Sequence, residues 1–213
     1  MPAPLIKICG LTTPETLEAA IAARADFAGF NFHLPSPRYV TPPIAQALTR
    51  QAAGRIKRVG LFVNSADAAL DAAVAGVELD VLQLHGAESP ARSAELRARF
   101  GLPVWKVISV ATRADLARAA GYVGAADFVL LDAKTPPGTL PGGMGLKFDW
   151  ALLSGWQAPL PWGLAGGLTP QNVCEAILLT GAPLVDTASG VESAPGVKDQ
   201  TLIAAFCQAA RAA

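Results

Sequence analysis

The sequence has few cysteines and histidines, and these scarcities limit the chemistry that it can carry. The three cysteines, Cys9, Cys174 and Cys207, form no Cys-x-x-Cys pair and are odd in number, so neither a disulfide framework nor a zinc site is indicated. With only His33 and His85 as histidines, a histidine-based metal site has little material, and no metal is predicted. This cysteine usage fits a reducing compartment, and we expect a cytoplasmic protein.

The chain also lacks an excess of charge of either sign, a secretory signal and a long apolar run. Lys plus Arg number 17 and Asp plus Glu number 17, so the formal net charge is zero and no nucleic acid is expected as a partner. Hydrophobic residues make up 52% of the chain, but Gly, Pro or charge interrupts every apolar stretch well below the length of a membrane span. That hydrophobicity therefore predicts a large buried core and no membrane partner.

What the sequence does contain is an alternation of short apolar runs with Ala-rich amphipathic segments. The predicted strands are Leu5 to Ile8, Phe27 to Phe30, Lys57 to Val63, Val81 to Leu84, Val104 to Ile108, Phe128 to Leu131, Trp162 to Ala165 and Leu184 to Asp186. The predicted helices are Pro14 to Arg24, Pro42 to Ala53, Ala66 to Ala75, Pro90 to Phe100, Arg113 to Ala120, Phe148 to Leu153, Pro170 to Leu179 and Asp199 to Ala212. This order predicts an α/β fold, a single-domain (β/α)₈ TIM barrel over residues 1–213, with a doubly wound sheet as the alternative.

Proline marks the start of several predicted helices. In Thr13-Pro14, Ser89-Pro90 and Thr169-Pro170, the residue before proline can cap the free amides of the first turn. One long irregular stretch, Ala133 to Leu146, follows the sixth strand and is rich in Pro and Gly, which makes it a candidate active-site lid.

In a (β/α)₈ barrel the active site lies at the carboxyl ends of the strands, so polar residues at those positions are the candidates for function. They are Cys9, Asn31, Asn64, His85, Asp132 and Asp186, with Arg38 in the loop after the second strand.

Glycine-rich loops follow the last two strands, where such barrels often bind phosphate through backbone amides. They contain Gly166 and Gly167, and then Ala188, Ser189 and Gly190. Glycine lets the backbone approach an anion closely, although either loop alone is equally well read as a tight turn. The two loops together favour a phosphate site.

Seven sequence blocks carry a resemblance to a known family. They are Lys7-Ile8-Cys9-Gly10-Leu11-Thr12, Ser36-Pro37-Arg38-Tyr39-Val40, Gln83-Leu84-His85-Gly86, Leu130-Leu131-Asp132, Phe148-Asp149-Trp150, Leu164-Ala165-Gly166-Gly167-Leu168 and Ser189-Gly190-Val191-Glu192. In this order the blocks resemble the phosphoribosylanthranilate isomerases of tryptophan biosynthesis, and the resemblance runs nearly from end to end.

The resemblance implies an Amadori rearrangement of N-(5-phosphoribosyl)anthranilate, an aldose–ketose isomerisation without a cofactor. It gives Asp132 the role of general acid and Cys9 that of general base. Arg38 would bind the anthranilate carboxylate, a role that suits a guanidinium, and His85 would be a secondary substrate contact. The structural alternatives are a helix-capping Asp132, a small buried hydrophobe at Cys9, a solvated Arg38 and a histidine satisfied by its neighbours.

Strand geometry adds one hypothesis about support for Cys9. Lys7 should point to the same side of its strand as Cys9, into the barrel, where a lysine needs a counter-charge. Because the eighth strand neighbours the first in a closed barrel, Asp186 is the candidate partner of Lys7. Such a pair either fixes the strand register or tunes Cys9, and we favour the structural role.

Two departures from the family pattern stand out. Met144 occupies a position of the sixth-strand loop where the family usually has Thr, and Thr187-Ala188 replaces the usual Val-Ser before Ser189. The alternatives to the isomerase are a ribulose-phosphate epimerase, an indole-glycerol-phosphate synthase or a non-catalytic phosphosugar-binding scaffold. The first two need metal ligands or catalytic Lys and Glu at strand ends that this chain does not show, and Cys9 with Asp132 opposes the third. We expect a small phosphosugar-anthranilate substrate and a monomer or homodimer.

Overall fold

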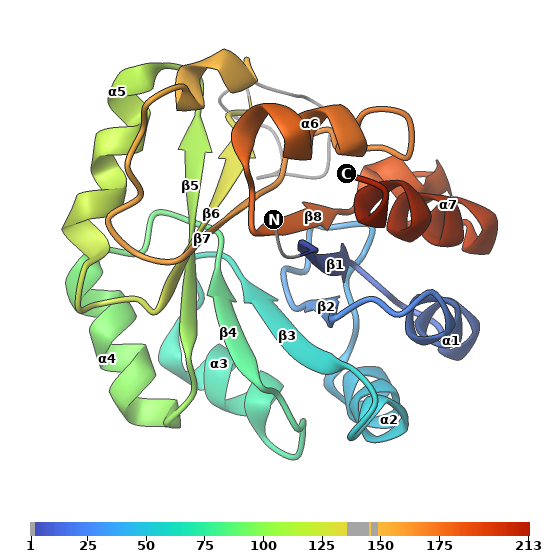
Figure 1. Ribbon diagram of the computed structural model, residues 1–213. Helices are drawn as coiled ribbons and strands as arrows, with labels where there is room; N and C mark the ends of the chain where they lie inside the picture. Colours follow the sequence, from blue (N-terminus) through green and yellow to red (C-terminus); the bar gives the residue numbers. More distant parts are fainter. Residues whose placement is uncertain (1–2, 136–144, 146–148) are drawn as a thin grey trace.

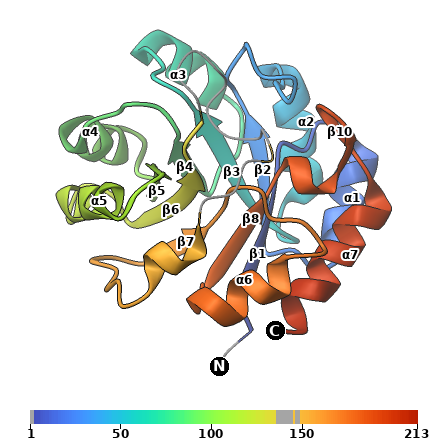
Figure 2. The same cartoon turned by 90° about the horizontal axis from the view of Figure 1, so that it is seen from above.

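The computed structural model describes residues 3–135, 145 and 149–213, and within them eight parallel strands close into a barrel in chain order (Figures 1 and 2). The strands are β1 (Leu5–Cys9), β2 (Phe27–Asn31), β3 (Lys57–Phe62), β4 (Val81–Leu84), β5 (Val104–Val110), β6 (Phe128–Ala133), β7 (Trp162–Leu164) and β8 (Leu184–Thr187). Closure is made by β1 and β8, with Lys7 in register with Asp186. The predicted TIM barrel is therefore confirmed, and the doubly wound alternative is wrong because an open sheet would leave β1 and β8 unpaired.

Helices surround the barrel, as the view from above shows (Figure 2). They are α1 (Pro14–Ala22), α2 (Pro42–Ala52), α3 (Asp67–Val74), α4 (Pro90–Phe100), α5 (Arg113–Leu116), η1 (Ala117–Tyr122), η2 (Trp150–Leu153), α6 (Val173–Thr180), η3 (Ser189–Val191) and α7 (Gln200–Arg211). A small hairpin that the sequence did not predict, β9 (Glu192–Ala194) with β10 (Val197–Lys198), lies between η3 and α7. None of the described helices is long and apolar enough to cross a membrane.

The proline-marked helix starts are confirmed at two of three sites. Thr13 accepts a hydrogen bond from the amide of Thr16, and Ser89 accepts one from the amide of Arg92. The third expectation, a helix starting at Pro170 with Thr169 as its cap, is wrong, because α6 begins at Val173.

The physical reason lies in the turn that precedes α6. The Asn172 side-chain oxygen accepts from the amide of Thr169 at 2.8 Å, and its Nδ2 donates to the carbonyl of Gly167 at 3.0 Å. These bonds close a turn before the helix, and they tie that turn to the loop after β7.

Apolar side chains fill the barrel interior at the amino ends of the strands. Trp105 stacks on Phe128 with ring centroids 4.6 Å apart and meets Phe27 edge-on at 4.9 Å. These rings pack against buried residues of several strands, Val59, Val81, Val107, Leu130, Ala165 and Leu184. The three rings stand on the first or second residues of β2, β5 and β6.

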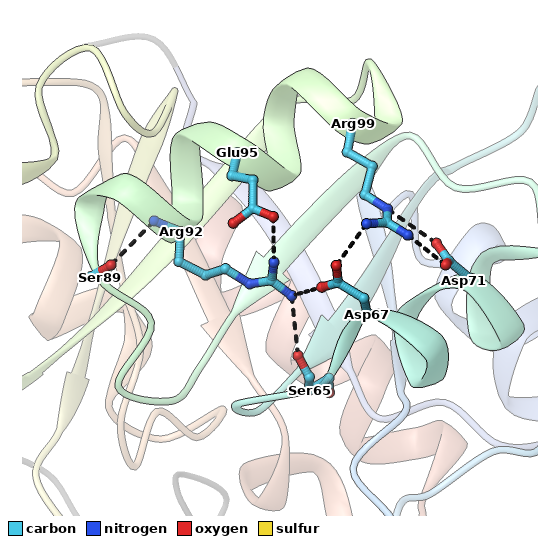
Figure 3. Close-up of polar contacts among 7 residues, drawn as sticks. All are labelled: Ser65, Asp67, Asp71, Ser89, Arg92, Glu95 and Arg99. Atoms are coloured by element: carbon cyan, nitrogen blue, oxygen red, sulfur yellow. Dashed lines mark hydrogen bonds and ion pairs between the residues drawn. The ribbon is translucent and has the colours of Figure 1, made fainter.

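A surface network of ion pairs joins α3 to α4 (Figure 3). Arg99 contacts Asp67 at 2.7 Å and Asp71 at 2.5 Å, while Arg92 contacts Asp67 and, at 2.8 Å, Glu95 on its own helix. Exposed ion pairs contribute little individually, so we interpret this network as orienting the two helices rather than as a functional site.

Candidate active site

A pocket opens at the carboxyl ends of the strands, which is the end of the barrel that the sequence predicts for function. Its empty volume is about 760 Å³, including the open mouth. The predicted site residues that line it are Cys9, Arg38, His85, Asp132, Gly166, Gly167, Asp186, Ala188 and Ser189. We call it the barrel-mouth pocket. The candidate Asn31 also lines it, whereas Lys7, Asn64 and Gly190 lie outside its lining.

Cys9 ends β1 at the floor of the barrel-mouth pocket and is only 6% exposed. Burial raises the pKa of its thiol, and the ammonium of Lys7 opposes that rise. Gly29 on β2 makes room for the sulfur, since a Cβ at position 29 would lie 2.9 Å from Cys9 Sγ. The Lys7 ammonium is therefore placed to stabilise a Cys9 thiolate against the cost of burial.

The predicted partner of Lys7 is confirmed. Lys7 Nζ lies 2.9 Å from Asp186 Oδ2, and the lysine is fully buried. Burial disfavours the ammonium, but the charges of Asp186 and Cys9 outweigh this and raise the pKa of Lys7. Burial also raises the pKa of Asp186, against the pull of Lys7. We interpret the pair as a charged lysine held by a carboxylate, because the lysine's own shift favours its protonated form.

Asp132 lies near the end of β6 and meets His85 across the pocket. His85 Nε2 is 3.1 Å from Asp132 Oδ2, and Asp132 Oδ1 accepts from the amide of Ala133 at 2.8 Å. Both side chains are nearly buried, at 9% and 8% exposure. Each carboxylate oxygen of Asp132 thus has a partner, and the two partners fix the orientation of its side chain. His85 both contacts Asp132 and lines the pocket.

A buried network supports the loop that carries His85. Lys106 Nζ lies 2.9 Å from Glu88 Oε2 and donates to the carbonyl of Gly86 at 2.7 Å. Glu88 in turn accepts from the amides of Asn64 at 2.7 Å and Gly86 at 2.9 Å. Burial lowers the pKa of Lys106, and the same burial opposes the ionisation of Glu88, whose pKa the lysine nevertheless lowers. These contacts lock together the loops after β3 and β4.

Arg38 lies beside the pocket with its guanidinium already held by a carboxylate. Nε and Nη2 each donate to Glu192, to Oε1 and Oε2 respectively, both at 2.7 Å. Gly10, with φ 78°, lets the arginine side chain pass, since a Cβ there would lie 2.6 Å from Arg38 Cδ. The solvated-arginine alternative is wrong, because Arg38 is 6% exposed. Arg38 is therefore a buried side chain, held by a carboxylate, in the lining of the pocket.

The two glycine-rich loops line the pocket with Gly166, Gly167, Ala188 and Ser189. Within the described chain, no hydrogen-bond acceptor faces the amides of Gly166, Gly167 or Ser189. Gly166 has φ 85°, and a Cβ there would lie 2.5 Å from the amide nitrogen of Ala133, so the position requires glycine. Gly190 instead lies against the carbonyl oxygen of Leu168, which explains its absence from the lining.

Comparison with known proteins gives this arrangement a family. The family model for N-(5'phosphoribosyl)anthranilate (PRA) isomerase matches residues 6–209. The chain belongs to the PRA isomerase family. A PRA isomerase from Paracoccus denitrificans is 57% identical over 208 residues, covering 97% of each chain, and one from Paramagnetospirillum magneticum is 52% identical over 207 residues, covering 97% of this chain and 96% of the relative.

Solved PRA isomerase structures share the whole barrel. The structure of the Thermotoga maritima enzyme superposes with a TM-score of 0.88 at 33% identity, covering 99% of this chain and 100% of the other. A PRA isomerase in complex with reduced 1-(o-carboxyphenylamino)-1-deoxyribulose 5-phosphate gives a TM-score of 0.86 at 31% identity with the same coverage. The resemblance drawn from the seven sequence blocks is thus confirmed.

Several polar residues of this PRA isomerase site escaped sequence reasoning. Gln83 is fully buried and lines the pocket, and its side-chain oxygen and nitrogen have no partner among the described residues. Its position two residues before His85 on β4, on the same inward face, was the available signal. Lys106, Glu88 and Lys198 gave no such signal, because their spacing does not show which charges become buried. Glu192 stood in one of the seven family blocks, but no role was assigned to it.

The two departures from the family pattern differ in what the structure says of them. Met144 lies outside the described residues, as does most of the predicted lid. Of the lid residues that the structure describes, Ala133, Thr135 and Gly145 line the pocket. Thr187 donates through Oγ1 to the carbonyl of Leu168 at 2.7 Å, so it ties the loop after β8 to the loop after β7. Among the described residues, no group of three His, Cys, Asp or Glu side chains is placed to hold a metal.

Proposed function

We propose that the chain isomerises N-(5-phosphoribosyl)anthranilate to 1-(2-carboxyphenylamino)-1-deoxyribulose 5-phosphate, an Amadori rearrangement of tryptophan biosynthesis. The observation that carries the proposal is the placement of Cys9 and Asp132 in one pocket of a PRA isomerase family barrel. An intramolecular isomerisation of this kind needs one proton donor and one proton acceptor, and it needs no change of oxidation state in the protein.

Asp132 is the proposed acid. Its proton goes to the ribose ring oxygen while the anilino nitrogen pushes its electron pair toward C1, so the C1–O bond breaks and a protonated Schiff base forms. The side chain of Asp132 lies in a nearly buried position beside His85. His85 fixes the carboxyl so that it faces the ring oxygen, which lowers the entropic cost of the proton transfer.

Cys9 is the proposed base. Its thiolate removes the proton from C2, and the electron pair forms the C1–C2 double bond of an enolamine while the Schiff-base nitrogen is neutralised. The Cys9 thiol then returns a proton to C1 while the C2 hydroxyl gives one to the Asp132 carboxylate, which yields the ketone and restores both groups. Because burial raises the pKa of Cys9, the thiolate once formed is a stronger base than an ordinary one, and Lys7 stabilises it.

The proposed substrate carries an acidic group at each end, and each group has a candidate binding region in the pocket. Arg38 lies on one side and can donate to the anthranilate carboxylate, while the amides of Gly166, Gly167 and Ser189 can donate to the phosphate. Gly190 then acts by shaping the loop rather than by contact. The proposed acid and base line the same pocket as these two regions.

The test is to supply N-(5-phosphoribosyl)anthranilate to the purified chain and to follow loss of anthranilate fluorescence. Since substrate and product have the same mass, carbon NMR must show the new ketone carbon at C2. Binding of the substrate without turnover would support the scaffold alternative and overturn the proposal.

The setting of the enzyme is part of the same proposal. We place it in the cytoplasm, in line with its cysteine usage, and as a monomer or homodimer. A relative from Thermotoga maritima is described as a dimeric enzyme from which monomers were generated. Sedimentation of this chain over a range of concentrations decides between the two states.

A further inference from the structure

Glu192 on β9 joins two buried cations beside the pocket. Its two oxygens accept from Arg38 Nε and Nη2 at 2.7 Å each, and Oε1 also lies 2.6 Å from Lys198 Nζ. The side chain of Glu192 is 4% exposed and that of Lys198 is fully buried. A carboxylate in this position has all its strong contacts inside the protein, so its geometry is fixed by them.

Lys198 extends this network to the loop after β8. Besides Glu192, its Nζ donates to the carbonyl of Ala188 at 2.8 Å, in the loop that offers amides to phosphate. The charges of Lys198 and Cys9 also interact, since Lys198 opposes the rise of the Cys9 pKa that burial causes. The chain of contacts from Arg38 to Ala188 therefore passes beside the base.

The hairpin that bears both residues is itself anchored. The amide of Gly196 donates to Glu192 Oε2 at 3.2 Å. Gly196 has φ 82°, and a Cβ there would lie 2.6 Å from the carbonyl oxygen of Pro37, which immediately precedes Arg38. The β9–β10 hairpin thus packs directly on the loop that presents Arg38.

We infer that Glu192 is a positioning residue that couples the two ends of substrate recognition, holding Arg38 for the carboxylate and, through Lys198, the Ala188 loop for the phosphate. The inference rests on the proposed function, because it takes the substrate to carry both groups. Arg38 and the Ala188 loop are called the two grips below. A substrate that both grips bind reacts best when the distance between them is fixed, because a shift of either one moves C1 and C2 away from Cys9 and Asp132.

A merely structural role makes a different prediction. A buried ion cluster that only stabilises the fold would lower the free energy of unfolding when neutralised, without changing how much each substrate group contributes to binding. Coupling instead predicts that Glu192→Gln weakens the contributions of the carboxylate and of the phosphate together. The two roles therefore separate in ligand-binding measurements.

The experiment uses three inhibitors and calorimetric titration. The first is reduced 1-(o-carboxyphenylamino)-1-deoxyribulose 5-phosphate, the second lacks its carboxylate and the third lacks its phosphate. In the unaltered chain, loss of the carboxylate raises the Kd of the inhibitor by a ratio that we call the carboxylate factor, and loss of the phosphate raises it by the phosphate factor. In Glu192→Gln we expect both factors to shrink by about tenfold, because neither grip is positioned.

Variants that alter only one of the two grips show how each factor responds separately. Arg38→Lys should shrink only the carboxylate factor, and Lys198→Met mainly the phosphate factor. Glu88→Gln is the matched control, because Glu88 is another buried carboxylate paired with a lysine, Lys106, away from both grips. It should destabilise the fold and leave both factors unchanged.

The outcomes decide between the inference and its alternatives. If both factors in Glu192→Gln equal those of the unaltered chain, or if only the carboxylate factor shrinks, the coupling is refuted. Should Glu192→Gln fail to fold, Glu192→Asp keeps the charge but is too short to hold Arg38 and Lys198 together, and the same two factors are measured. If the unaltered chain turns over the substrate and Glu192→Gln leaves both factors unchanged, the inference alone is refuted. If the unaltered chain shows no turnover, the proposed function is refuted.

Discussion

His85 Nε2 lies 3.1 Å from Asp132 Oδ2, although the two residues come from strands that are separated in the barrel by β5. The contact explains how the carboxyl group of Asp132 is held in a fixed orientation. It also changes the interpretation of His85, which sequence reasoning treated as a secondary substrate contact. In the folded chain it is first of all the partner of the proposed acid.

Removing His85 should therefore slow the chemical step more than it weakens binding. We expect His85→Ala to lower kcat by about 10- to 100-fold with a smaller change in KM, because the acid loses its orientation but keeps its proton-donating group. Steady-state kinetics with the phosphoribosylated substrate measure both constants. A rise in KM at unchanged kcat would instead assign His85 to substrate binding alone.

The protonation of Cys9 is the second prediction. Because burial raises the pKa of this thiol, the thiolate fraction at neutral pH is small and grows as pH rises through the raised value. In a Cys174→Ala/Cys207→Ala background, the rate of alkylation by iodoacetamide should climb with pH to beyond the usual range of a cysteine.

Lys7 supplies the control for this titration. It lowers the pKa of Cys9, so Lys7→Met should move the alkylation profile to still higher pH. The conservative Lys7→Arg should leave the profile closer to the original. If alkylation of Cys9 in the Cys174→Ala/Cys207→Ala background followed the pKa of an ordinary thiol, the buried environment that we assign to Cys9 would be contradicted.

The Lys7–Asp186 pair should matter strongly for stability. Asp186→Asn leaves a fully buried ammonium without its counter-charge, which typically costs about 3–5 kcal/mol. Replacing both partners, Lys7→Met with Asp186→Leu, should restore much of that loss, because no buried charge remains. Urea unfolding measures the free energies. Unchanged stability and an unchanged Cys9 titration in Asp186→Asn together would refute a role for the pair.

Close packing of Gly29 on Cys9 gives a steric prediction. A Cβ at position 29 would lie 2.9 Å from Cys9 Sγ and 3.0 Å from Cys9 Cα, so Gly29→Ala must shift β1 or β2. We expect a loss of about 1–3 kcal/mol in stability together with reduced kcat. Gly121→Ala is the control, since its nearest contact would be an ordinary 4.0 Å from Pro90 Cγ. If Gly29→Ala and Gly121→Ala were equally active, a shift of the Cys9 sulfur would not impair turnover, and the prediction would be wrong.

Much of this architecture is readable from the sequence because local and global patterns agree. Apolar runs of strand length alternate with helices, and strand ends in a barrel converge on one mouth, so Cys9 and Asp132 are placed together by topology alone. The Lys7–Asp186 pair followed from two rules, the alternation of side chains along a strand and the adjacency of the first and last strands.

The contacts that sequence reasoning missed lie outside those rules. Arg38 and Glu192 are 154 residues apart and come from a loop and a short hairpin, whose position no periodicity specifies. Lys106 and Glu88 are only 18 residues apart, but nothing in their spacing shows that both become buried. The helix start at Pro170 failed for a related reason, because the Asn172 side chain closes a turn where the proline pattern alone indicates a first helical turn.

Turnover of N-(5-phosphoribosyl)anthranilate by the unaltered chain, Cys9→Ser and Asp132→Asn tests the acid–base assignment most directly, with binding of the reduced product analogue measured alongside. We predict that both variants bind the analogue within a few-fold of the unaltered chain while kcat falls by about 10²–10⁴-fold in each, because each loses one proton-transfer group. Turnover at the unaltered rate in either variant would contradict the assignment of that residue.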